Sequence, residues 1–411
     1  MSNPTEAASD VVVIGGGVIG LAIAWRACER GLRAVVLERD QPGRGTSWLG
    51  AGMLAPVAEA SAREERLLAL GLASARLYPA FLSELRAASG RDDLGYLACG
   101  TLLAARDADE AESLVRELEL RRRLGLRVGR LRASQARRLE PALAPSLRLA
   151  LDVPDDHAID PRKLTAALVD AIATCGGEVL AGAEVTRLTT AGGRVTGVAL
   201  TGGGRVCADR VVIAAGVWSP RIGGLPRTMP VRAVKGQILR LHDPAGPGLL
   251  TRVTRLASTY IVPRGDGRYV IGATMEERGF DTTVTAGAAF DLLRDAIELV
   301  PGVSELVLDE LAAGLRPATP DNAPVIGAGD PPGLYWATGH HRNGILLAPV
   351  TAALVLDALS GESPSELASD FTPGRFAAGD LAGTGDPDPV GARRPLPVGD
   401  SGTRSPAESP T

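Results

Sequence analysis

The chain has 411 residues, a formal net charge of −4 and four cysteines. At roughly 150 residues per domain, this length indicates two or three domains, and the mild charge excludes field-driven binding to nucleic acid or to an anionic membrane surface. The cysteines are widely spaced and form no C-x-x-C pair, which disfavours a metal site and a disulfide framework. The uncharged run 11–25 is too short to cross a bilayer. We therefore expect a cytoplasmic protein without a bound metal.

The first unit that the sequence predicts is a dinucleotide-binding turn. β-Branched residues over 11–14 are typical of a parallel strand that is buried on both faces. Gly15, Gly17 and Gly20 follow as G-x-G-x-x-G and open an apolar, helix-compatible stretch. A second apolar run then ends at Glu38. Strand, glycine turn, helix, strand and acid in this order favour a bound dinucleotide over a glycine turn that binds nothing.

Each of these residues has an expected role. Gly15 permits the sharp turn, Gly17 lets the backbone approach a pyrophosphate, and Gly20 lets helix and sheet pack closely. The N-terminus of the helix directs free N–H groups and the positive end of its dipole at the phosphates. Glu38 can accept hydrogen bonds from ribose hydroxyls, and its charge repels a 2′-phosphate, so NADP is the least expected dinucleotide. These residues alone leave NAD and FAD open.

The rest of the chain alternates between helix and strand patterns. Apolar residues at helical spacing predict helices over 61–88, 108–124, 161–172, 288–300 and 345–359. In the last of these, Pro349 is expected in the first turn, because proline interrupts a helix interior. Short β-rich runs predict strands over 178–181, 184–189, 194–200, 210–215, 230–241, 260–263, 269–272 and 334–337.

The predicted strands 260–263 and 269–272 form a hairpin. Asp266-Gly267 is a type I′ turn signal, and a two-residue turn there pairs Tyr260 with Ala273. Tyr260 and Met275 are then diagonal neighbours on one face of the sheet. This places a phenol hydroxyl and a thioether over the same space.

The predicted strand at 210–215 resumes the sheet of the first unit, so the nucleotide domain is discontinuous in sequence. We assign it to 10–85, 150–222 and 313–376, and a substrate domain to 86–149 and 223–312. The composition of 377–411, rich in Pro, Gly, Asp, Arg and Ser, predicts a disordered tail.

Several motifs together carry a family resemblance. They are the unit 15–38, Gly-Ala-Gly-Met at 50–53, Ala-Ala-Gly-Val-Trp-Ser at 214–219, Gly-Leu-Arg-Pro at 314–317 and Gly-His-His-Arg-Asn-Gly-Ile at 339–345. From about residue 10 to 376 the chain resembles the FAD-dependent D-amino-acid oxidase family, and within it the glycine oxidases of thiamine biosynthesis. The implied fold is α/β plus α+β: a Rossmann-like FAD-binding domain (GR2-type) and a discontinuous antiparallel-sheet substrate domain.

The resemblance implies a noncovalent FAD. The residues expected to contact it are Gly15, Gly16, Gly17, Val18, Ile19, Gly20, Glu38, Arg39, Thr46, Ser47, Ala51, Gly52, Met53, Val185, Gly216, Trp218, Arg316, His341, Arg342, Asn343, Gly344 and Ile345. A helix that begins just past Gly344 would turn its positive end toward the flavin ring.

For the substrate, Arg316 is the expected partner of an amino acid's carboxylate, because its planar fork suits a bidentate grip. Arg342 is a second cation, either at the rim of that carboxylate or near the flavin. Tyr260 and Met275 line the substrate pocket in the family, so Tyr260, Arg316 and Met275 are the expected catalytic residues. Structural ion pairing is the alternative for both arginines. Many relatives carry histidine where this chain has Ser258 and an aromatic residue where it has His341, which leaves amine selectivity open.

The implied reaction oxidises glycine, and also sarcosine or small D-amino acids, to the imino acid and glyoxylate while O2 is reduced to H2O2. The resemblance further implies service to thiamine thiazole synthesis, a thiazole synthase as acceptor of the imine, and a homotetramer. The alternatives are a sarcosine or D-amino-acid oxidase, or an acceptor-dependent flavin dehydrogenase of the same family. An NAD-dependent dehydrogenase is disfavoured, because it does not need the motifs at 50–53 and 339–345; a flavin-binding module without turnover is the remaining alternative.

Overall fold

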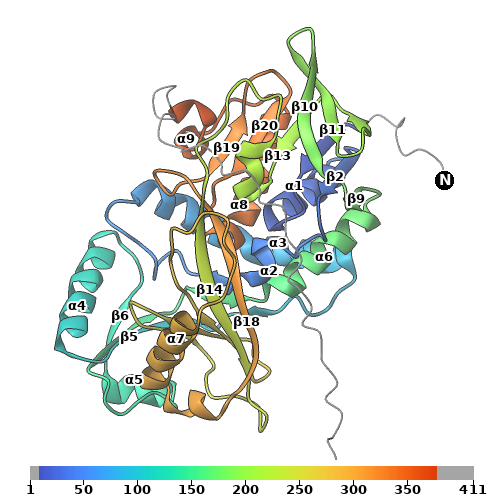
Figure 1. The fold of residues 1–411 in the computed structure, drawn as a ribbon. Helices are drawn as coiled ribbons and strands as arrows, with labels where there is room; N and C mark the ends of the chain where they lie inside the picture. The colour runs from blue at the N-terminus through green and yellow to red at the C-terminus, as the bar shows by residue number, and fades with distance from the viewer. Residues whose placement is uncertain (1–8, 377–411) are drawn as a thin grey trace, which may run out of the picture.

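The computed structural model describes residues 9–376, and its two large sheets lie in separate halves of the molecule (Figure 1). The disorder predicted for 377–411 falls outside this range. Among the described residues, no helix is both long and apolar enough to cross a membrane.

The first sheet has six strands in the order β19-β20-β13-β1-β2-β9. Their bounds are Val325–Ala328 (β19), Leu334–Thr338 (β20), Val211–Ile213 (β13), Val11–Ile14 (β1), Ala34–Glu38 (β2) and Glu178–Ala181 (β9). All neighbours pair in parallel except β19 with β20. Because β13 lies beside β1, the prediction that this sheet resumes late in the chain is confirmed.

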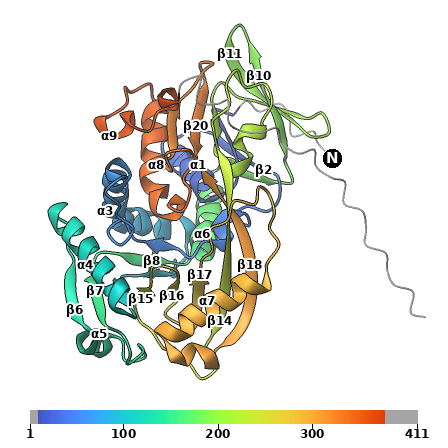
Figure 2. The same ribbon diagram turned by 60° about the vertical axis from the view of Figure 1, so that its left-hand side comes forward.

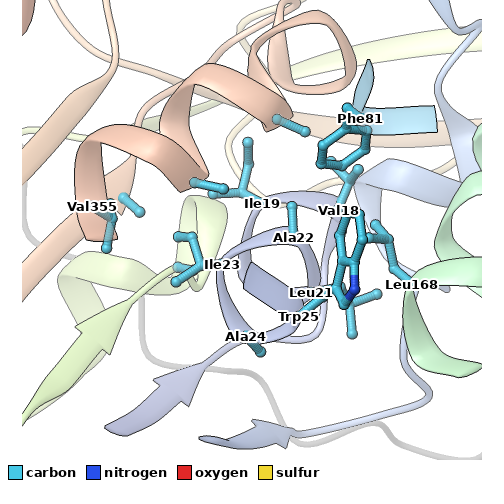
Figure 3. Packing of buried hydrophobic residues seen from close by; sticks show 14 of the residues in the cluster. Val18, Ile19, Leu21, Ala22, Ile23, Ala24, Trp25, Phe81, Leu168 and Val355 are labelled. Carbon is cyan, nitrogen blue, oxygen red and sulfur yellow. The ribbon is translucent and has the colours of Figure 1, made fainter. Parts of the chain in front are cut away.

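Both faces of this sheet are covered. Val11 and Val13 belong to a hydrophobic core that also contains residues of four helices: α1 (Val18–Glu29), α3 (Glu65–Ser89), α6 (Pro161–Thr174) and α8 (Gly344–Leu359). Val12 and Ile14 face the other side, where a three-stranded sheet covers them: β10 (Val185–Ala191), β11 (Arg194–Leu200) and β12 (Arg205–Cys207). In the helical layer, the rings of Trp25 and Phe81 meet edge to face at 5.1 Å (Figure 3). The wholly apolar strand β1 thus contributes side chains to two hydrophobic cores, one on each face of the sheet.

Helix α8 departs from the expectation for Pro349. The helix begins at Gly344, so Pro349 lies in its second turn and cannot donate to the carbonyl of Ile345. The hydroxyl of Tyr78, from α3, donates to that carbonyl instead. The proline is tolerated because a neighbouring helix satisfies the carbonyl that it leaves free.

The second sheet has eight strands in the order β18-β14-β17-β16-β15-β5-β7-β6. Their bounds are Val307–Ala318 (β18), Arg232–His242 (β14), Arg268–Gly272 (β17), Tyr260–Pro263 (β16), Val253–Arg255 (β15), Thr101–Ala105 (β5), Leu149–Val153 (β7) and Gly129–Arg132 (β6). It is antiparallel except for β15 and β5, which pair in parallel. Helix α7 (Ala286–Leu299) contacts β14 and β17, and α4 (Ala108–Arg123) contacts β5 and β7 (Figure 2).

The predicted hairpin exists, but the register that we predicted for it is wrong by one residue. Tyr260 pairs with Gly272 rather than with Ala273, because the backbone N–H of Arg264 donates to Arg268 and closes a three-residue loop. Gly265 and Gly267 both adopt positive φ, 79° and 84°, in that loop. A two-residue turn would have used only the second glycine. Tyr260 and Met275 are therefore not the diagonal pair that we expected.

The remaining elements are short. A small sheet is formed by β3 (Met53–Leu54), β8 (His157–Ile159) and β4 (Tyr96–Leu97). The other helices are α2 (Thr46–Leu49), α5 (Ala133–Leu139) and α9 (Glu366–Ser369), with 3-10 turns at Gly216–Arg221, Pro301–Glu305 and Pro373–Arg375. The predicted domain boundaries at 150 and 313 fall inside β7 and β18, two strands of the eight-stranded sheet. The division into domains otherwise stays a prediction.

Candidate active site

A cavity of about 1450 Å³ runs from the carboxyl ends of β1 and β2 to the eight-stranded sheet. Ile14 and Glu38 line it at one end, and Tyr260 and Arg316 at the other. The carboxyl ends of parallel strands are where open α/β sheets bind their ligands. The cavity is also large enough for a dinucleotide together with a small substrate.

Gly15, Gly17 and Gly52 line the nucleotide end of this cavity, and Gly20 lies behind them in the packing of α1; we call these four glycines the glycine cradle. A Cβ on Gly15 would lie 2.6 Å from the carbonyl oxygen of Ala214, and Gly15 has φ +106°. A Cβ on Gly20 would lie 2.0 Å from the oxygen of Gly15. A Cβ on Gly52, at φ +78°, would lie 1.9 Å from the oxygen of Ile159. At Gly15, Gly20 and Gly52 the backbone approaches another backbone so closely that no side chain fits.

The acid at the end of β2 is held by backbone amides. Glu38 accepts hydrogen bonds from Gly16 N at 2.7 Å and from Asp40 N at 2.9 Å. Ser47 Oγ accepts from Val18 N, at the start of α1, at 2.9 Å. These contacts fix a carboxylate and the N-terminus of a helix at one end of the cavity. They fit the ribose and the pyrophosphate of a dinucleotide.

Most of the residues expected to contact the cofactor line this one cavity. They are Gly15, Gly17, Val18, Ile19, Glu38, Arg39, Thr46, Ser47, Ala51, Gly52, Met53, Val185, Gly216, Trp218, Arg316, His341, Arg342, Asn343, Gly344 and Ile345. Gly16 and Gly20 do not line it: Gly16 binds Glu38, and Gly20 lets α1 pack against the preceding turn. The donors and the close backbone approaches present in the cavity therefore fit FAD.

The N-terminus of α8 lies at the middle of the cavity wall. His341 adopts φ 47° just before it, and its backbone N–H donates to Pro317 at 2.7 Å. Its buried Nε2 has no hydrogen-bond partner among residues 9–376. Burial, with Arg342 and Arg316 nearby, lowers the pKa of His341 to about 4. Burial likewise lowers the pKa of His340 to about 3, and its Nε2 lies 3.0 Å from Thr351 Oγ1. Both imidazoles are neutral at pH 7.

Arg316, on β18, lies with its guanidinium directly over Gly236 of β14. A Cβ on Gly236 would lie 2.4 Å from Nη1 and from Nη2, so any side chain there would displace the guanidinium. Nη1 donates to the carbonyl of Thr274 at 3.0 Å and to that of Lys235 at 3.4 Å. Within residues 9–376, Arg316 forms no ion pair with a carboxylate. A cation with its other donors free can bind an incoming carboxylate.

Our sequence reasoning missed Gly236, although a signal was present. A glycine inside a predicted strand indicates a close approach by another group, and the predicted strand 230–241 contains one.

Tyr260 and Met275 also line the substrate end. A Cβ on Gly272 would lie 2.6 Å from the Tyr260 hydroxyl, so this glycine makes room for the phenol. Burial raises the pKa of Tyr260, and the charge of Arg316 opposes that rise. Met275 lies past the end of β17 and is 66% exposed.

Arg342 reaches the cavity wall, but it is not a free cation. Its Nε lies 2.8 Å from Glu59 and its Nη2 lies 3.1 Å from Glu64. Glu59 also pairs with Arg255 at 3.4 Å. Sequence reasoning identified neither Glu59 nor Arg255, because no local pattern marks them. Among the described residues, no group of three or more His, Cys, Asp or Glu side chains could hold a metal ion.

Comparison with known proteins gives one consistent family. The family described as FAD dependent oxidoreductase matches residues 10–358. The glycine oxidase of Geobacillus kaustophilus is 36% identical over 368 residues, which are 89% of this chain and 95% of that protein. The crystal structure of glycine oxidase from Geobacillus kaustophilus superposes with a TM-score of 0.84 at 34% identity, covering 90% of this chain and 99% of that one.

The bifunctional protein ThiO/ThiG of Synechocystis sp. is 37% identical over 376 residues, or 90% of this chain and 54% of that protein. The chain thus spans about half the length of this bifunctional relative.

Proposed function

We propose, because the chain belongs to the family of FAD dependent oxidoreductases, that it oxidises glycine and related small amino acids with O2. Glycine, O2 and water would give glyoxylate, ammonia and H2O2. The similarity to glycine oxidases over nearly their whole length supports this choice of substrate. The observation that carries the proposal is the guanidinium of Arg316, which has no carboxylate partner within residues 9–376 and lies in the same cavity as the glycine cradle.

The FAD, when bound, supplies the electron acceptor that no side chain of the site can supply. Arg316 binds the carboxylate of the substrate and so fixes the position of its α-carbon. Tyr260 closes the same end of the site and remains a neutral phenol, since burial raises its pKa. The positive charge of Arg316 lowers the pKa of the bound amine and favours its neutral, reactive form. These residues act by orientation and electrostatics, and no side chain has to remove a proton from carbon.

A link to thiazole formation is the finer part of the proposal. It is supported by the bifunctional relatives, in which a domain like this chain is fused to a second one named ThiG. The imine would then pass to a thiazole synthase as an alternative to its hydrolysis. A cytoplasmic location, expected from the cysteine pattern and the short apolar run at 11–25, and a homotetramer, expected from the resemblance, stay predictions.

Anaerobic titration of the FAD-loaded protein tests the function. Glycine should bleach the visible absorbance of the flavin, and admission of O2 should restore it with one equivalent of H2O2. Sarcosine and D-alanine, titrated in parallel, define the amine preference. An unbleached flavin with all three amines would contradict the proposal. Bleaching without peroxide on reoxidation would instead indicate an acceptor-dependent dehydrogenase.

A further inference from the structure

Three arginines line the substrate end of the cavity: Arg255, Arg316 and Arg342. We call them the arginine wall. Two of them share one carboxylate, because Glu59 lies 3.4 Å from Arg255 Nη1 and 2.8 Å from Arg342 Nε. Arg316 has no such partner within residues 9–376. The wall therefore contains one cation that is free for a ligand and two that are already engaged.

The position of Glu59 is fixed by a buried arginine and a buried aspartate, which hold the two residues before it. Arg121 of α4, 1% exposed, donates to the carbonyls of Val57 at 2.9 Å and of Ala58 at 2.6 Å. Asp156, fully buried, accepts from the N–H groups of the same two residues at 3.1 and 2.5 Å. Burial of two ionisable side chains is costly. Here the two side chains hold the backbone of Val57 and Ala58, the residues directly before Glu59, and the oxidation chemistry uses neither side chain.

The charge balance of the wall follows from these pairs. Arg255 and Arg342 pair with the carboxylates of Glu59 and Glu64, and Arg316 has no carboxylate partner within residues 9–376. Tyr260 lies in the field of Arg316, Glu59 and Arg255 together, so these groups share one neighbourhood. The one arginine without a carboxylate partner, Arg316, matches one substrate carboxylate. A second carboxylate could bind Arg255 or Arg342 only by displacing Glu59, and it would meet the repulsion of that charge.

We propose that Glu59 restricts the site to substrates with one carboxylate, by engaging the two arginines that would otherwise bind a second. The inference rests on the proposed function, since it takes Arg316 as the partner of the first carboxylate. It assigns Glu59 a role in substrate specificity and no role in the oxidation step. Removal of the Glu59 charge should open the site to N-carboxymethyl amino acids.

Two ethers that cannot be oxidised as amines test this without turnover. Methoxyacetate has one carboxylate, and diglycolate is the same ether with a carboxylate at each end. Their dissociation constants are measured from the change in flavin absorbance of the FAD-loaded protein. In Glu59→Gln, the ratio of the diglycolate to the methoxyacetate constant should fall about tenfold or more, since a charge-assisted hydrogen bond is worth at least that.

Matched variants separate the proposed role of Glu59 from a general effect of removing a carboxylate near the arginines. Glu64→Gln removes a partner of Arg342 and leaves both contacts of Glu59, so the ratio should change less than about threefold. Arg255→Gln added to Glu59→Gln should reverse most of the gain for diglycolate and leave methoxyacetate binding intact. If Glu59→Gln loses its FAD, Glu59→Asp, which keeps the charge but shortens its reach, should show a partial fall in the ratio.

An unchanged ratio in the Glu59 variants, with methoxyacetate still bound, would overturn the specificity proposal and leave the proposed function standing. Absence of methoxyacetate binding to the unmodified protein would overturn both, because Arg316 would then not be a carboxylate site. A flavin that glycine does not bleach, in a protein whose ratio shifts as expected, would contradict only the oxidation.

Discussion

The glycine cradle and the arginine wall lie at two ends of the same cavity, but they are built differently. In the cradle the backbone itself forms the functional surface. It can do so because glycine has no side chain to block the close approach. In the wall the functional groups are long side chains from two strands and one turn, and their availability depends on which carboxylates they pair with. At Gly15, Gly20 and Gly52 the cradle has no room for a side chain. The charge of the wall, by contrast, can be altered by changing one carboxylate partner.

The substitution with the largest expected effect on the cradle is Gly52→Ala. Its Cβ would lie 1.9 Å from the oxygen of Ile159, and the residue has φ +78°. We expect a loss of more than about 3 kcal/mol in the free energy of unfolding, together with loss of bound FAD. Denaturant unfolding and the flavin absorbance of the purified protein measure the two effects.

Gly31→Ala is the matched control for that prediction. Gly31 has φ +80°, but a Cβ there meets nothing within 4 Å. It should therefore cost only the strain of the left-handed backbone, about 1–2 kcal/mol, and FAD should stay bound. Equal losses in the two variants would show that close approach contributes nothing at Gly52.

At the arginine wall, Gly236 matters because it leaves room for the guanidinium of Arg316. Gly236→Ala should push the guanidinium of Arg316 out of place, because the new Cβ would lie 2.4 Å from both Nη atoms. A flexible side chain can move, so the fold and the FAD should survive. The KM for glycine should rise roughly tenfold, the loss of about one charge-assisted hydrogen bond. Steady-state peroxide formation measures it, and an unchanged KM would show that the guanidinium need not lie over this glycine.

Helix α8 begins at the wall of the same cavity, and its support can be tested separately. Tyr78→Phe removes the hydroxyl that satisfies the carbonyl of Ile345. A buried carbonyl without a partner costs about 1–3 kcal/mol, measured as a shift in the denaturant midpoint at constant slope. A neutral result would mean that water replaces the hydroxyl. Tyr335→Phe, at a partly exposed tyrosine on β20, is the control, and its midpoint should hardly change.

The smallest effect concerns pH. The pKa of His340 is lowered to about 3 in the folded protein from an ordinary value of 6.5. Between these values the unfolded chain binds a proton that the folded chain does not, so stability falls as the pH falls. The slope from this residue is about 1.4 kcal/mol per pH unit. His340→Gln should flatten the loss of stability between pH 6 and pH 5 by that amount, and an unchanged slope would contradict the assignment.

Gly15, Gly17 and Gly20 of the cradle could be predicted from local signals in the sequence, whereas Gly52 was named through the resemblance, in the motif at 50–53. A strand, three glycines at fixed spacing, a helix and an acid all lie within 11–38, and β1, α1 and β2 have the expected order. The hairpin register was missed for an equally local reason, since Gly265 also carries the turn and only the Asp266-Gly267 pair was considered.

The wall could be predicted only in part. The Gly-Leu-Arg-Pro and Arg-Asn-Gly-Ile motifs identified Arg316 and Arg342. The partner of Arg342, however, is Glu59, which lies 283 positions away in the sequence. Nothing near Glu59 in the sequence indicates that it pairs with two arginines. Which cation is free and which is engaged is a property of the fold, and it decides what the site can bind.

The central claim is that Arg316 is the free carboxylate-binding cation and Arg342 is not. The most direct measurement is the dissociation constant of methoxyacetate, from flavin absorbance, in Arg316→Ala and in Arg342→Ala. We expect a rise of roughly a hundredfold for Arg316→Ala, the loss of a bidentate charged contact, and less than about fivefold for Arg342→Ala, with FAD bound in both. Equal losses, or a larger loss for Arg342→Ala, would contradict the account.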